Sequence, residues 1–368
     1  MPVLIILIVV WLVTWLQRVI YRKLWGNHLD AHVSFGDKNM TAGQETELIE
    51  TMGNAKWLPL PWVQLKFEIF RNGKSDNLFR ADLFNILFHQ QIVRKSKLTL
   101  KKRGVYQIKE LSLLSYDLFV SKKLYRSYEN QAAITVYPKA LEREAIEVPY
   151  EKLMGQIATR RYTLEDPFLF KGIREYQPQD GFRDINFKAS ARNSRWLVNT
   201  HEYTLDQKVK VVLLTDKSSQ YYDESEYETA LRYAAELVTC LERDGVPTAF
   251  YSNGEDALDH TEPKLLEGCS ENHIESVLEA LARLNLDETI TPGAEVLREL
   301  CERREADEFY VIISPNHNRE ILDAFGYLKD YTNACQFISP ISYRNYNSMA
   351  EEEQKLEETV ENFFYYRA

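Results

Sequence analysis

A dense run of charged side chains of both signs lies near the middle of the chain, between residues 166 and 195. Cations outnumber carboxylates there, and aromatic residues separate them: Arg174, Arg183, Lys188, Arg192 and Arg195 with Glu175, Asp180 and Asp184. Guanidinium forks bind carboxylates through two parallel hydrogen bonds, so such a stretch can close into a structural clasp. The excess of cations also fits a site for an anion or an acidic partner. We favour the structural clasp.

Motifs of the common catalytic and nucleotide-binding sites are absent from the sequence. There is no G-x-x-x-x-G-K-[ST] or G-x-G-x-x-G run, no H-E-x-x-H and no G-x-S-x-G. The four cysteines are scattered without a CxxC pair: Cys240, Cys269, Cys301 and Cys335. We therefore expect reduced thiols, no disulfide framework and no zinc site. The sequence predicts no catalytic residue, and we favour a protein that is not an enzyme.

Composition and length limit the class of protein and the number of domains. The 368-residue chain has 45 lysines and arginines against 55 aspartates and glutamates, a net charge of −10. This acidic balance argues against a nucleic-acid binder, whose binding face needs an excess of Lys and Arg. Hydrophobic residues make up 45% of the chain, which is enough for a sizeable core. The length predicts about two domains besides any further elements.

An apolar run at the N-terminus, Val3 to Leu16, predicts a single transmembrane helix. A spanning helix needs about 20 residues, or fewer when flanking side chains reach the interface. Interfacial aromatic residues accompany the run, and basic residues follow it: Trp11, Trp15, Tyr21 and Trp25, and Arg18, Arg22 and Lys23. By the positive-inside rule we expect a single-pass protein of the cell membrane, with residues 1–25 as anchor and the C-terminal domains in the cytoplasm.

Alternation with a period of two marks residues 31–138, where turn residues separate short apolar runs. The clearest run, Trp62–Phe70, ends before the turn dipeptide Asn72-Gly73, and other strands are expected at 32–35, 97–100, 105–108 and 133–137. Short strands without helical patterns predict an all-β, immunoglobulin-like sandwich over residues 26–150, acting as a spacer or docking module. We interpret the basic cluster at residues 95–103 as a solvated strand face, with contact to lipid headgroups as the alternative.

Strands alternate with helices in the C-terminal part. Lys208–Thr215 is a nearly continuous apolar run, as expected for a strand buried on both faces of a parallel sheet. Further strands are predicted at 246–252, 309–313 and 336–338, and helices at 225–243, 271–284, 293–304, 319–328 and 351–363. The pattern predicts a doubly wound α/β domain over residues 201–368. Ligands are expected at the carboxyl ends of its strands.

The charged stretch resembles the bacterial and archaeal "domain of unknown function 58" family. The family pattern G-x-R-x-Y-x-P-G-D…R-x-I-x-W-x-x-S-A-R is matched at these positions: Gly172, Arg174, Tyr176, Pro178, Asp180, Arg183, Ile185, Ser190, Ala191 and Arg192. Gln179 replaces the usual glycine and Phe187 the usual tryptophan. Because Val136-Tyr137-Pro138 and other upstream runs also look like the family's β domain, the resemblance covers nearly the whole chain.

The resemblance implies a membrane-anchored protein with a β domain and a C-terminal von Willebrand factor A-like domain, joined by a linking segment at residues 151–200. It also implies a protein partner, because family genes often neighbour those of MoxR-type AAA+ ATPases. It implies no reaction, because no enzymatic activity is established for the family as a whole.

Von Willebrand factor A-like domains can carry a metal-ion-dependent adhesion site, which needs Asp-x-Ser-x-Ser after the first strand, a Thr from a second loop and an Asp from a third. Such hard oxygen donors hold Mg²⁺. Asp216 and Ser218 match the first loop, and Thr291 or Thr289 matches the second. Gln220 replaces the last Ser, and the third loop lacks the Asp. We expect a degenerate site without metal, in which Asp216 and Ser218 cap the following helix or brace the loop.

Two functions are consistent with these observations. We favour a membrane-tethered, non-enzymatic protein-interaction module that works with a MoxR-type AAA+ ATPase in assembly or cell-envelope processes. The alternative is a metal-dependent adhesion-site protein or an enzyme, with Asp216, Ser218 and Thr291 acting through Mg²⁺.

Overall fold

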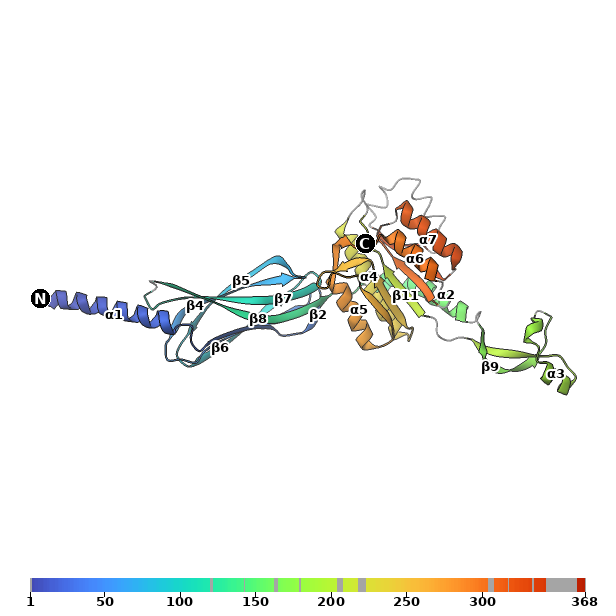
Figure 1. The fold of residues 1–368 in the computed structure, drawn as a ribbon, viewed down its shortest axis with the longest axis horizontal. Helices are drawn as coiled ribbons and strands as arrows, with labels where there is room; N and C mark the ends of the chain where they lie inside the picture. The colour runs from blue at the N-terminus through green and yellow to red at the C-terminus, as the bar shows by residue number, and fades with distance from the viewer. Residues whose placement is uncertain are drawn as a thin grey trace. The chain divides into compact units, whose positions relative to one another are not determined.

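The computed structural model describes residues 2–119, 122–141, 143–161, 165–178, 180–203, 208–217, 223–303, 308–316, 318–332, 334–341 and 363–367. The chain divides into two compact units (Figure 1). The first unit comprises residues 1–139, 256–260 and 278–285. The second unit comprises residues 140–255, 261–277 and 286–368.

The first unit begins with a long apolar helix, α1 (Pro2–Leu24). Residues Val3–Leu24 have a mean hydropathy of 2.4 and are long and apolar enough to cross a membrane. Nearly all side chains from Val3 to Leu16 are exposed, whereas Tyr21 and Trp25 are buried in the core of the β strands that follow. The helix that the sequence predicts is therefore present, and its C-terminal turns pack against the rest of the unit.

Two sheets that share one apolar core follow α1. The first sheet has the order β1-β3-β6: β1 (Leu29–Phe35), β3 (Glu45–Asn54) and β6 (Gln90–Thr99). The second has the order β2-β8-β7-β4-β5: β2 (Asn39–Thr41), β8 (Lys123–Tyr137), β7 (Gly104–Tyr116), β4 (Leu60–Arg71) and β5 (Lys74–Ile86). Alternate residues of β4, such as Leu65, Phe67 and Ile69, point into the core. This β domain ends near Lys139, before the boundary at residue 150 that the sequence suggests.

The basic cluster at residues 95–103 is occupied by contacts inside the first unit. Lys95 and Lys97 form ion pairs with acidic residues of β3 at 2.8 and 2.9 Å. Arg103 is buried and donates to backbone carbonyls of the same unit at 2.9 and 2.8 Å. Arg103 lies just before the start of β7. Asp117, which contacts Gln17 of α1, lies just after its end, so Arg103 and α1 are at opposite ends of this strand. These contacts fit the interpretation of the cluster as a solvated strand face, and contact with lipid headgroups stays an untested alternative.

The second unit is built around a six-stranded sheet. Its order is β14-β12-β11-β16-β17-β18: β14 (Lys264–Gly268), β12 (Thr248–Ser252), β11 (Lys208–Leu213), β16 (Glu308–Ile313), β17 (Cys335–Ile341) and β18 (Phe363–Arg367). Neighbouring strands are parallel except for β14, which pairs antiparallel with β12 at one edge. The chain is thus a mixed α/β protein with several sheets. Phe363 begins β18, so the expectation that a helix extends to residue 363 is wrong there, and its residues 351–362 lie outside the described residues.

Helices cover both faces of this sheet. They are α2 (Arg143–Arg161), α4 (Glu224–Arg243), α6 (Gly293–Arg303) and α7 (Arg319–Tyr331). Helix α5 (Glu271–Arg283) and the paired short strands β13 (Gly254–Asp256) and β15 (Leu284–Thr289) have residues in both units. Val212 and Ile312 cluster with α6 and α7. Alternate residues of a strand face opposite sides, so Val211 and Val311 are buried on the other face, where α4 contacts the strands.

A small β hairpin with an inserted helix lies in the range expected for the linking segment. It contains β9 (Glu165–Glu175), the single-turn helix η1 (Phe182–Asp184), α3 (Phe187–Asn193) and β10 (Leu197–Tyr203). The two strands pair antiparallel, from Leu197 opposite Glu175 onward. We call residues 165–203 the β9–β10 module. It holds every matched residue of the family-like motif.

Candidate functional site

The loops that follow β11, β12 and β16 lie at one edge of the six-stranded sheet. These strands run parallel, so their carboxyl ends meet at the same edge. Asp216 follows β11, Asn253 follows β12 and Ser314 follows β16. Ligands of open α/β sheets bind at such an edge, which makes it the first candidate site.

Both oxygens of the Asp216 carboxylate accept hydrogen bonds. The backbone N–H of Gly293 donates to Oδ1 at 2.8 Å, and Nδ2 of Asn253 donates to Oδ2 at 2.7 Å. Gly293 is the first residue of α6, where free N–H groups and the helix dipole stabilise a negative charge. A Cβ atom at residue 293 would lie 2.5 Å from Oδ2. Asp216 thus braces the loop before α6 and does not cap the following helix, α4, whose N-cap is Asp223.

Asn253 ties three loops together at this edge. Its side chain is fully buried, and Oδ1 accepts from the backbone N–H of Thr215 at 2.8 Å. Nδ2 donates to Asp216 and also to the backbone carbonyl of Thr291 at 2.9 Å. The structure therefore brings the predicted residues Asp216 and Thr291 into adjacent loops, with Asn253 between them.

The side chain of Thr291 lies beside a different carboxylate, that of Glu262. Glu262 also contacts the hydroxyl of Tyr251 at 3.0 Å and the ammonium of Lys264 at 3.1 Å. Burial of Glu262 opposes its ionisation, but the interactions with Thr291, Lys264 and Tyr251 outweigh that effect and lower its pKa. The hydroxyl of Thr291 thus stabilises the ionised Glu262.

The described residues do not fit a Mg²⁺ site. Both oxygens of Asp216 are engaged, and the side chain of Thr291 meets another carboxylate. In the third loop, Oγ of Ser314 donates to the carbonyl of Asn316 at 2.8 Å. Within the ranges that the structure describes, no three His, Cys, Asp or Glu residues gather to hold a metal. Ser218, the remaining predicted ligand, lies outside the described residues.

The β9–β10 module is the second candidate site, and a charged clasp closes it. The guanidinium of Arg174 binds both oxygens of Asp180, each at 2.6 Å, and Arg195 pairs with Glu175 at 2.6 Å. The backbone N–H of Gln177 also donates to Asp180 at 2.7 Å. The Arg174 hydrogen bonds are the main cause that lowers the pKa of Asp180. This is the geometry that the clasp interpretation of the sequence expects.

Ser190 and Asn186 fix the inserted helix α3 on the hairpin. Oδ1 of Asn186 accepts from the N–H of Ala189 at 2.9 Å and so caps the helix. Oγ of Ser190 donates to the Asn186 carbonyl at 2.8 Å and accepts from the N–H of Leu197 at 2.9 Å. The motif residue Ser190 is therefore structural. Nothing in the structure requires glycine at Gly172, where an added Cβ would make an ordinary contact.

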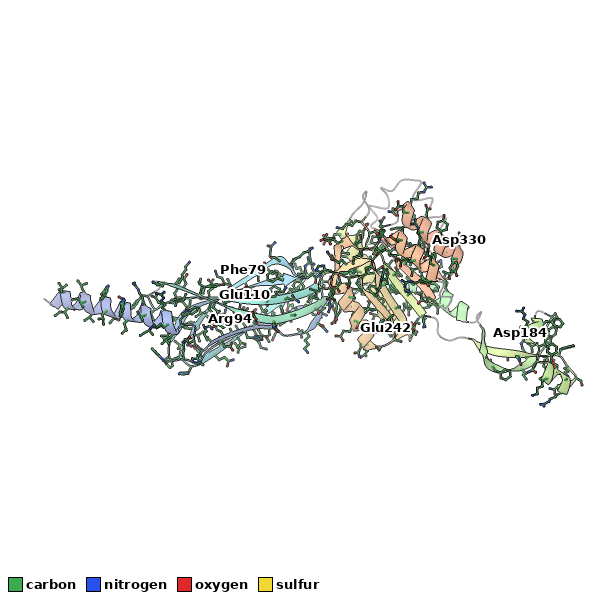
Figure 2. All side chains as sticks on the ribbon, in the orientation of Figure 1. Phe79, Arg94, Glu110, Asp184, Glu242 and Asp330 are labelled. Atoms are coloured by element: carbon green, nitrogen blue, oxygen red, sulfur yellow. The ribbon has the colours of Figure 1, made fainter. Side chains whose placement is uncertain are left out.

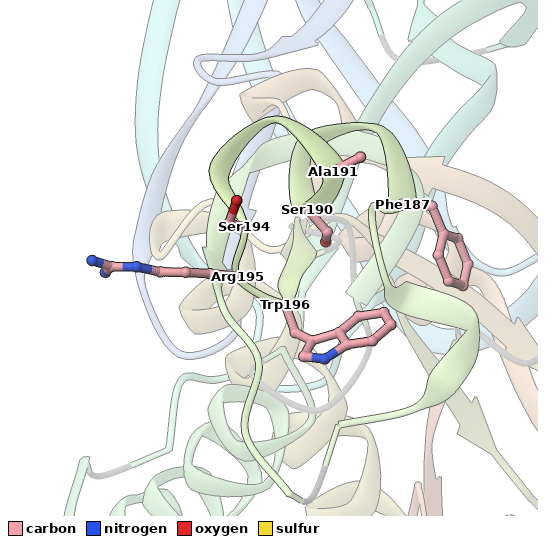
Figure 3. A pocket seen from close by; sticks show the side chains of 6 residues that line it. All are labelled: Phe187, Ser190, Ala191, Ser194, Arg195 and Trp196. Carbon is pink, nitrogen blue, oxygen red and sulfur yellow. The ribbon is translucent and has the colours of Figure 1, made fainter.

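An open pocket of about 370 Å³ is lined by residues of α3 and of the turn between α3 and β10 (Figure 3). Phe187 and Trp196 meet edge-on beside it, with ring centroids 6.4 Å apart and an interplanar angle of 83°. Both side chains are more than half exposed, at 60% and 58%. Figure 3 shows Phe187, Trp196 and Ser190 together with Arg195, which also lines the pocket but points away from the two rings. The pocket thus has two exposed aromatic rings beside α3, a helix that the hydrogen bonds of Asn186 and Ser190 fix on the hairpin.

Of the remaining motif residues of the module, Ile185 is buried and the others lie at its surface. Arg183 and Arg192 are exposed, as are Pro178 and the neighbouring Lys188, and Tyr176 is half-buried. Among the described residues, the side chains of Arg183, Lys188 and Arg192 form no ion pair. The motif therefore combines residues that hold the fold, such as Asp180, with cations that face solvent.

Sequence reasoning missed two residues of these sites. Trp196 falls just outside the family-like pattern, and the charge pattern gave no reason to single it out. Asn253 lies before Gly254, and this dipeptide reads as an ordinary turn. Its partner Asp216 lies 37 residues earlier, so no local signal could reveal the contact.

No protein-family model and no curated protein sequence matches the chain. Solved structures match parts of it at low similarity. The CARDB domain of a Pyrococcus furiosus protein is 15% identical, with 30% of this chain and 94% of that chain covered and a TM-score of 0.21. A non-cellulosomal cohesin from Archaeoglobus fulgidus is 10% identical (32% and 96% covered, TM-score 0.19). The sporulation control protein Spo0M from Bacillus subtilis is 9% identical (41% and 58% covered, TM-score 0.19). Likeness at this level carries no argument about family or activity.

Proposed function

We propose that this chain is a membrane-anchored, non-enzymatic protein-interaction module and that the β9–β10 module carries its contact surface. The observation that supports this most is the exposed pair of Phe187 and Trp196 beside the pocket. Aromatic residues and arginine supply much of the binding energy at protein interfaces. The clasp and the Ser190 hydrogen bonds hold these rings in place before a partner binds, which lowers the entropic cost of binding.

The partner we propose is a MoxR-type AAA+ ATPase, in assembly or cell-envelope processes. The support is the resemblance of residues 172–192 to the "domain of unknown function 58" family, whose genes often neighbour such ATPases. The exposed cations Arg183, Lys188 and Arg192 are suited to carboxylates on the partner. We therefore expect the contacted surface of the ATPase to be acidic.

The membrane attachment we propose is one crossing of the cell membrane by α1, with both units in the cytoplasm. The apolar side chains from Val3 to Leu16 are exposed, as lipid contact requires. The basic residues Arg18, Arg22 and Lys23 lie at the C-terminal side of this run, and such residues favour the cytoplasmic side.

We also propose the finer fold assignments, an immunoglobulin-like β domain and a von Willebrand factor A-like α/β domain. Two sheets around a shared core support the first. A mostly parallel six-stranded sheet with helices on both faces supports the second. Together with the motif at residues 172–192, these two fold assignments are the basis on which we propose that the chain belongs to the "domain of unknown function 58" family.

The alternative is a metal-dependent adhesion site or an enzyme with Asp216, Ser218 and Thr291 as Mg²⁺ ligands. One observation favours it, because Asn253 brings Asp216 and Thr291 together at the edge where such sheets bind ligands. We propose instead that Asp216 serves the fold and that no resident metal is needed. In calorimetric titrations of the full-length protein with Mg²⁺ and Mn²⁺, we expect no binding tighter than about millimolar. Tighter binding that Asp216→Ala abolishes would establish the alternative.

Site-specific photo-crosslinking tests the proposed contact surface. A photoreactive amino acid replaces Phe187 in the full-length protein in lipid nanodiscs, and a MoxR-type ATPase from the same organism is added. We expect a crosslink from this position. The matched control carries the same amino acid at Tyr327 of α7, which is also exposed, and should give none. Equal crosslinking from both positions, or from neither, would contradict the proposal.

A further inference from the structure

The end of the β domain next to α1 carries exposed apolar side chains on three loops. The loops are residues 55–59 between β3 and β4, 87–89 between β5 and β6, and 117–119 after β7. Their exposed apolar residues are Trp57 (61%), Leu87 (51%), Phe88 (60%), Leu118 (47%) and Phe119 (59%). Leu29, the first residue of β1, pairs with Asn54 at the end of β3, so the loop at residues 55–59 begins beside the point where the chain leaves α1.

Hydrogen bonds fix two of these loops directly to α1. Nε2 of Gln17 donates to Oδ2 of Asp117 at 3.1 Å, and the hydroxyl of Tyr21 donates to the carbonyl of Pro59 at 2.7 Å. The buried ammonium of Lys56 donates to two backbone carbonyls at the end of α1, where the helix dipole favours a cation. The third loop joins them because the N–H of His89 donates to the Lys56 carbonyl at 3.1 Å. The loops and the last turns of α1 therefore form one body.

The exposed apolar part of α1 is too short to cross a bilayer by itself. At about 1.5 Å per residue, the run from Val3 to Leu16 spans about 21 Å, against a hydrocarbon core of about 30 Å. The next turns, from Gln17 to Trp25, pack against the β domain. A bilayer that covers the whole exposed run therefore reaches the level of Gln17 and the loop beside it.

The charges around these loops suit the headgroup region of the same bilayer. Lys122 and Lys123 are exposed at the base of the loop that carries Leu118 and Phe119. Long basic side chains reach from such positions to anionic headgroups, and tryptophan and other aromatic residues favour the membrane interface.

We propose that the end of the β domain that carries Trp57, Phe88 and Phe119 lies in the interfacial region of an anionic bilayer, so that the loops and α1 together form the anchor. This inference rests on the proposed membrane crossing of α1. It makes the β domain a rigid extension of the anchor at the membrane surface, and it assigns the lipid contact to Lys122 and Lys123 in place of the cluster at residues 95–103.

Fluorescent labels at single added cysteines of the full-length protein test this inference. Phe88→Cys and Phe119→Cys carry an environment-sensitive dye in a Cys269→Ser background, because Cys269 is the exposed native thiol. The protein is reconstituted in vesicles of phosphatidylcholine and phosphatidylglycerol, with or without lipids brominated high on their acyl chains. We expect blue-shifted emission and quenching by the brominated lipids at both positions. The protein without an added cysteine gives the background of labelling.

Phe79→Cys provides the matched control. Phe79, which Figure 2 labels, lies near the middle of β5 and is 61% exposed, and the second half of the strand separates it from the loop of Phe88. We expect its label to emit as in water and to escape quenching. Leu7→Cys, in the exposed part of α1, reports on the crossing itself.

The outcomes separate the inference from the proposal on which it rests. Quenching at Leu7→Cys without quenching at positions 88 and 119 would overturn the inference and leave the membrane crossing intact. No quenching at Leu7→Cys would overturn both. Native tryptophan fluorescence gives a second measurement, because Trp57→Phe should remove part of the lipid-dependent quenching and Trp196→Phe should not. Equal effects of these two substitutions would also overturn the inference.

Discussion

The guanidinium of Arg174 grips the carboxylate of Asp180 with both terminal nitrogens, each 2.6 Å from one oxygen. The same carboxylate accepts the backbone N–H of Gln177. This contact joins the end of β9 to the turn before η1 and so closes the hairpin that presents Phe187 and Trp196. Planar, bidentate recognition of this kind needs arginine and is not reproduced by lysine.

Removal of the Arg174 fork should raise the pKa of Asp180. In the folded protein the Arg174 hydrogen bonds are the main cause that lowers this pKa below its ordinary value of about 3.9. The contact therefore contributes stability above about pH 4, and that contribution is lost as pH falls through the lowered pKa. NMR titration of the Asp180 carboxyl should show the rise in Arg174→Ala. Arg195→Ala, which breaks the neighbouring ion pair, should leave the titration near that of the wild type. Identical titrations of Asp180 in Arg174→Ala and wild type would contradict the clasp.

Gly293→Ala should destabilise the second unit. The added Cβ would lie 2.5 Å from Oδ2 of Asp216 and 3.1 Å from Cδ1 of Leu214, so the loop or the carboxylate must move. We expect a loss of about 1–3 kcal/mol in the free energy of unfolding, measured by urea denaturation. Gly326→Ala is the control, because that helical position has open space and should gain up to about 1 kcal/mol. Equal stability of the two variants would argue against the bracing role of Asp216.

Glu242→Gln should stabilise the protein at alkaline pH. Burial raises the pKa of Glu242, a residue of α4 labelled in Figure 2, to about 7. Its side chain is 1% exposed, and Nε2 of His273 lies 3.4 Å from Oε1. Because the folded pKa lies above the unfolded value of about 4.3, the contribution of this carboxyl to stability is complete below about pH 4 and is lost as pH rises to 7. The variant should lack this loss, so thermal unfolding should show a larger gain at about pH 8 than at about pH 5. A control, Glu288→Gln on an exposed position, should show no such difference. A gain that does not depend on pH would contradict the prediction.

Labelling of Cys269 should report the orientation of the chain in the membrane. Cys269 is exposed, whereas Cys335 is buried and the other two cysteines are partly covered. If the C-terminal domains are cytoplasmic, a membrane-impermeant maleimide should leave right-side-out vesicles unlabelled and react once the vesicles are opened. Cys269→Ser shows how much of the signal comes from this thiol. Labelling of sealed right-side-out vesicles at Cys269 would reverse the proposed orientation.

The sequence predicts α4, α5, α6 and α7 well because their signals are local, but it predicts no helix at α2 (Arg143–Arg161). Helix α4 is expected at residues 225–243 and lies at Glu224–Arg243, since an apolar face and the capping residue Asp223 mark it. Helix α6 likewise begins after Pro292, at Gly293. Such signals need no knowledge of distant partners.

The strands that the sequence missed have physical reasons for their weak signals. In β3 the inward positions include the buried polar residues Thr46, Glu50 and Asn54, so apolar alternation does not show. Strand β5 carries charged and polar residues along most of its length, and its inward face, which includes Arg80 and Asp82, is only partly buried, so its apolar period is hidden. Two features depend on tertiary placement and could not be predicted from local pattern. They are the contact of Asp216 with Asn253 and the exposed apolar residues on the three loops next to α1.

The affinity of the full-length protein in nanodiscs for a MoxR-type ATPase tests the central claim most directly. We predict measurable binding that Trp196→Ala weakens by about 2 kcal/mol, roughly 30-fold in the dissociation constant, as for a contact residue at the centre of an interface. Tyr327→Ala, which removes an aromatic side chain that is 70% exposed on α7, should change the constant less than about twofold. Absence of binding by the wild type, or equal binding by wild type and Trp196→Ala, would contradict the account.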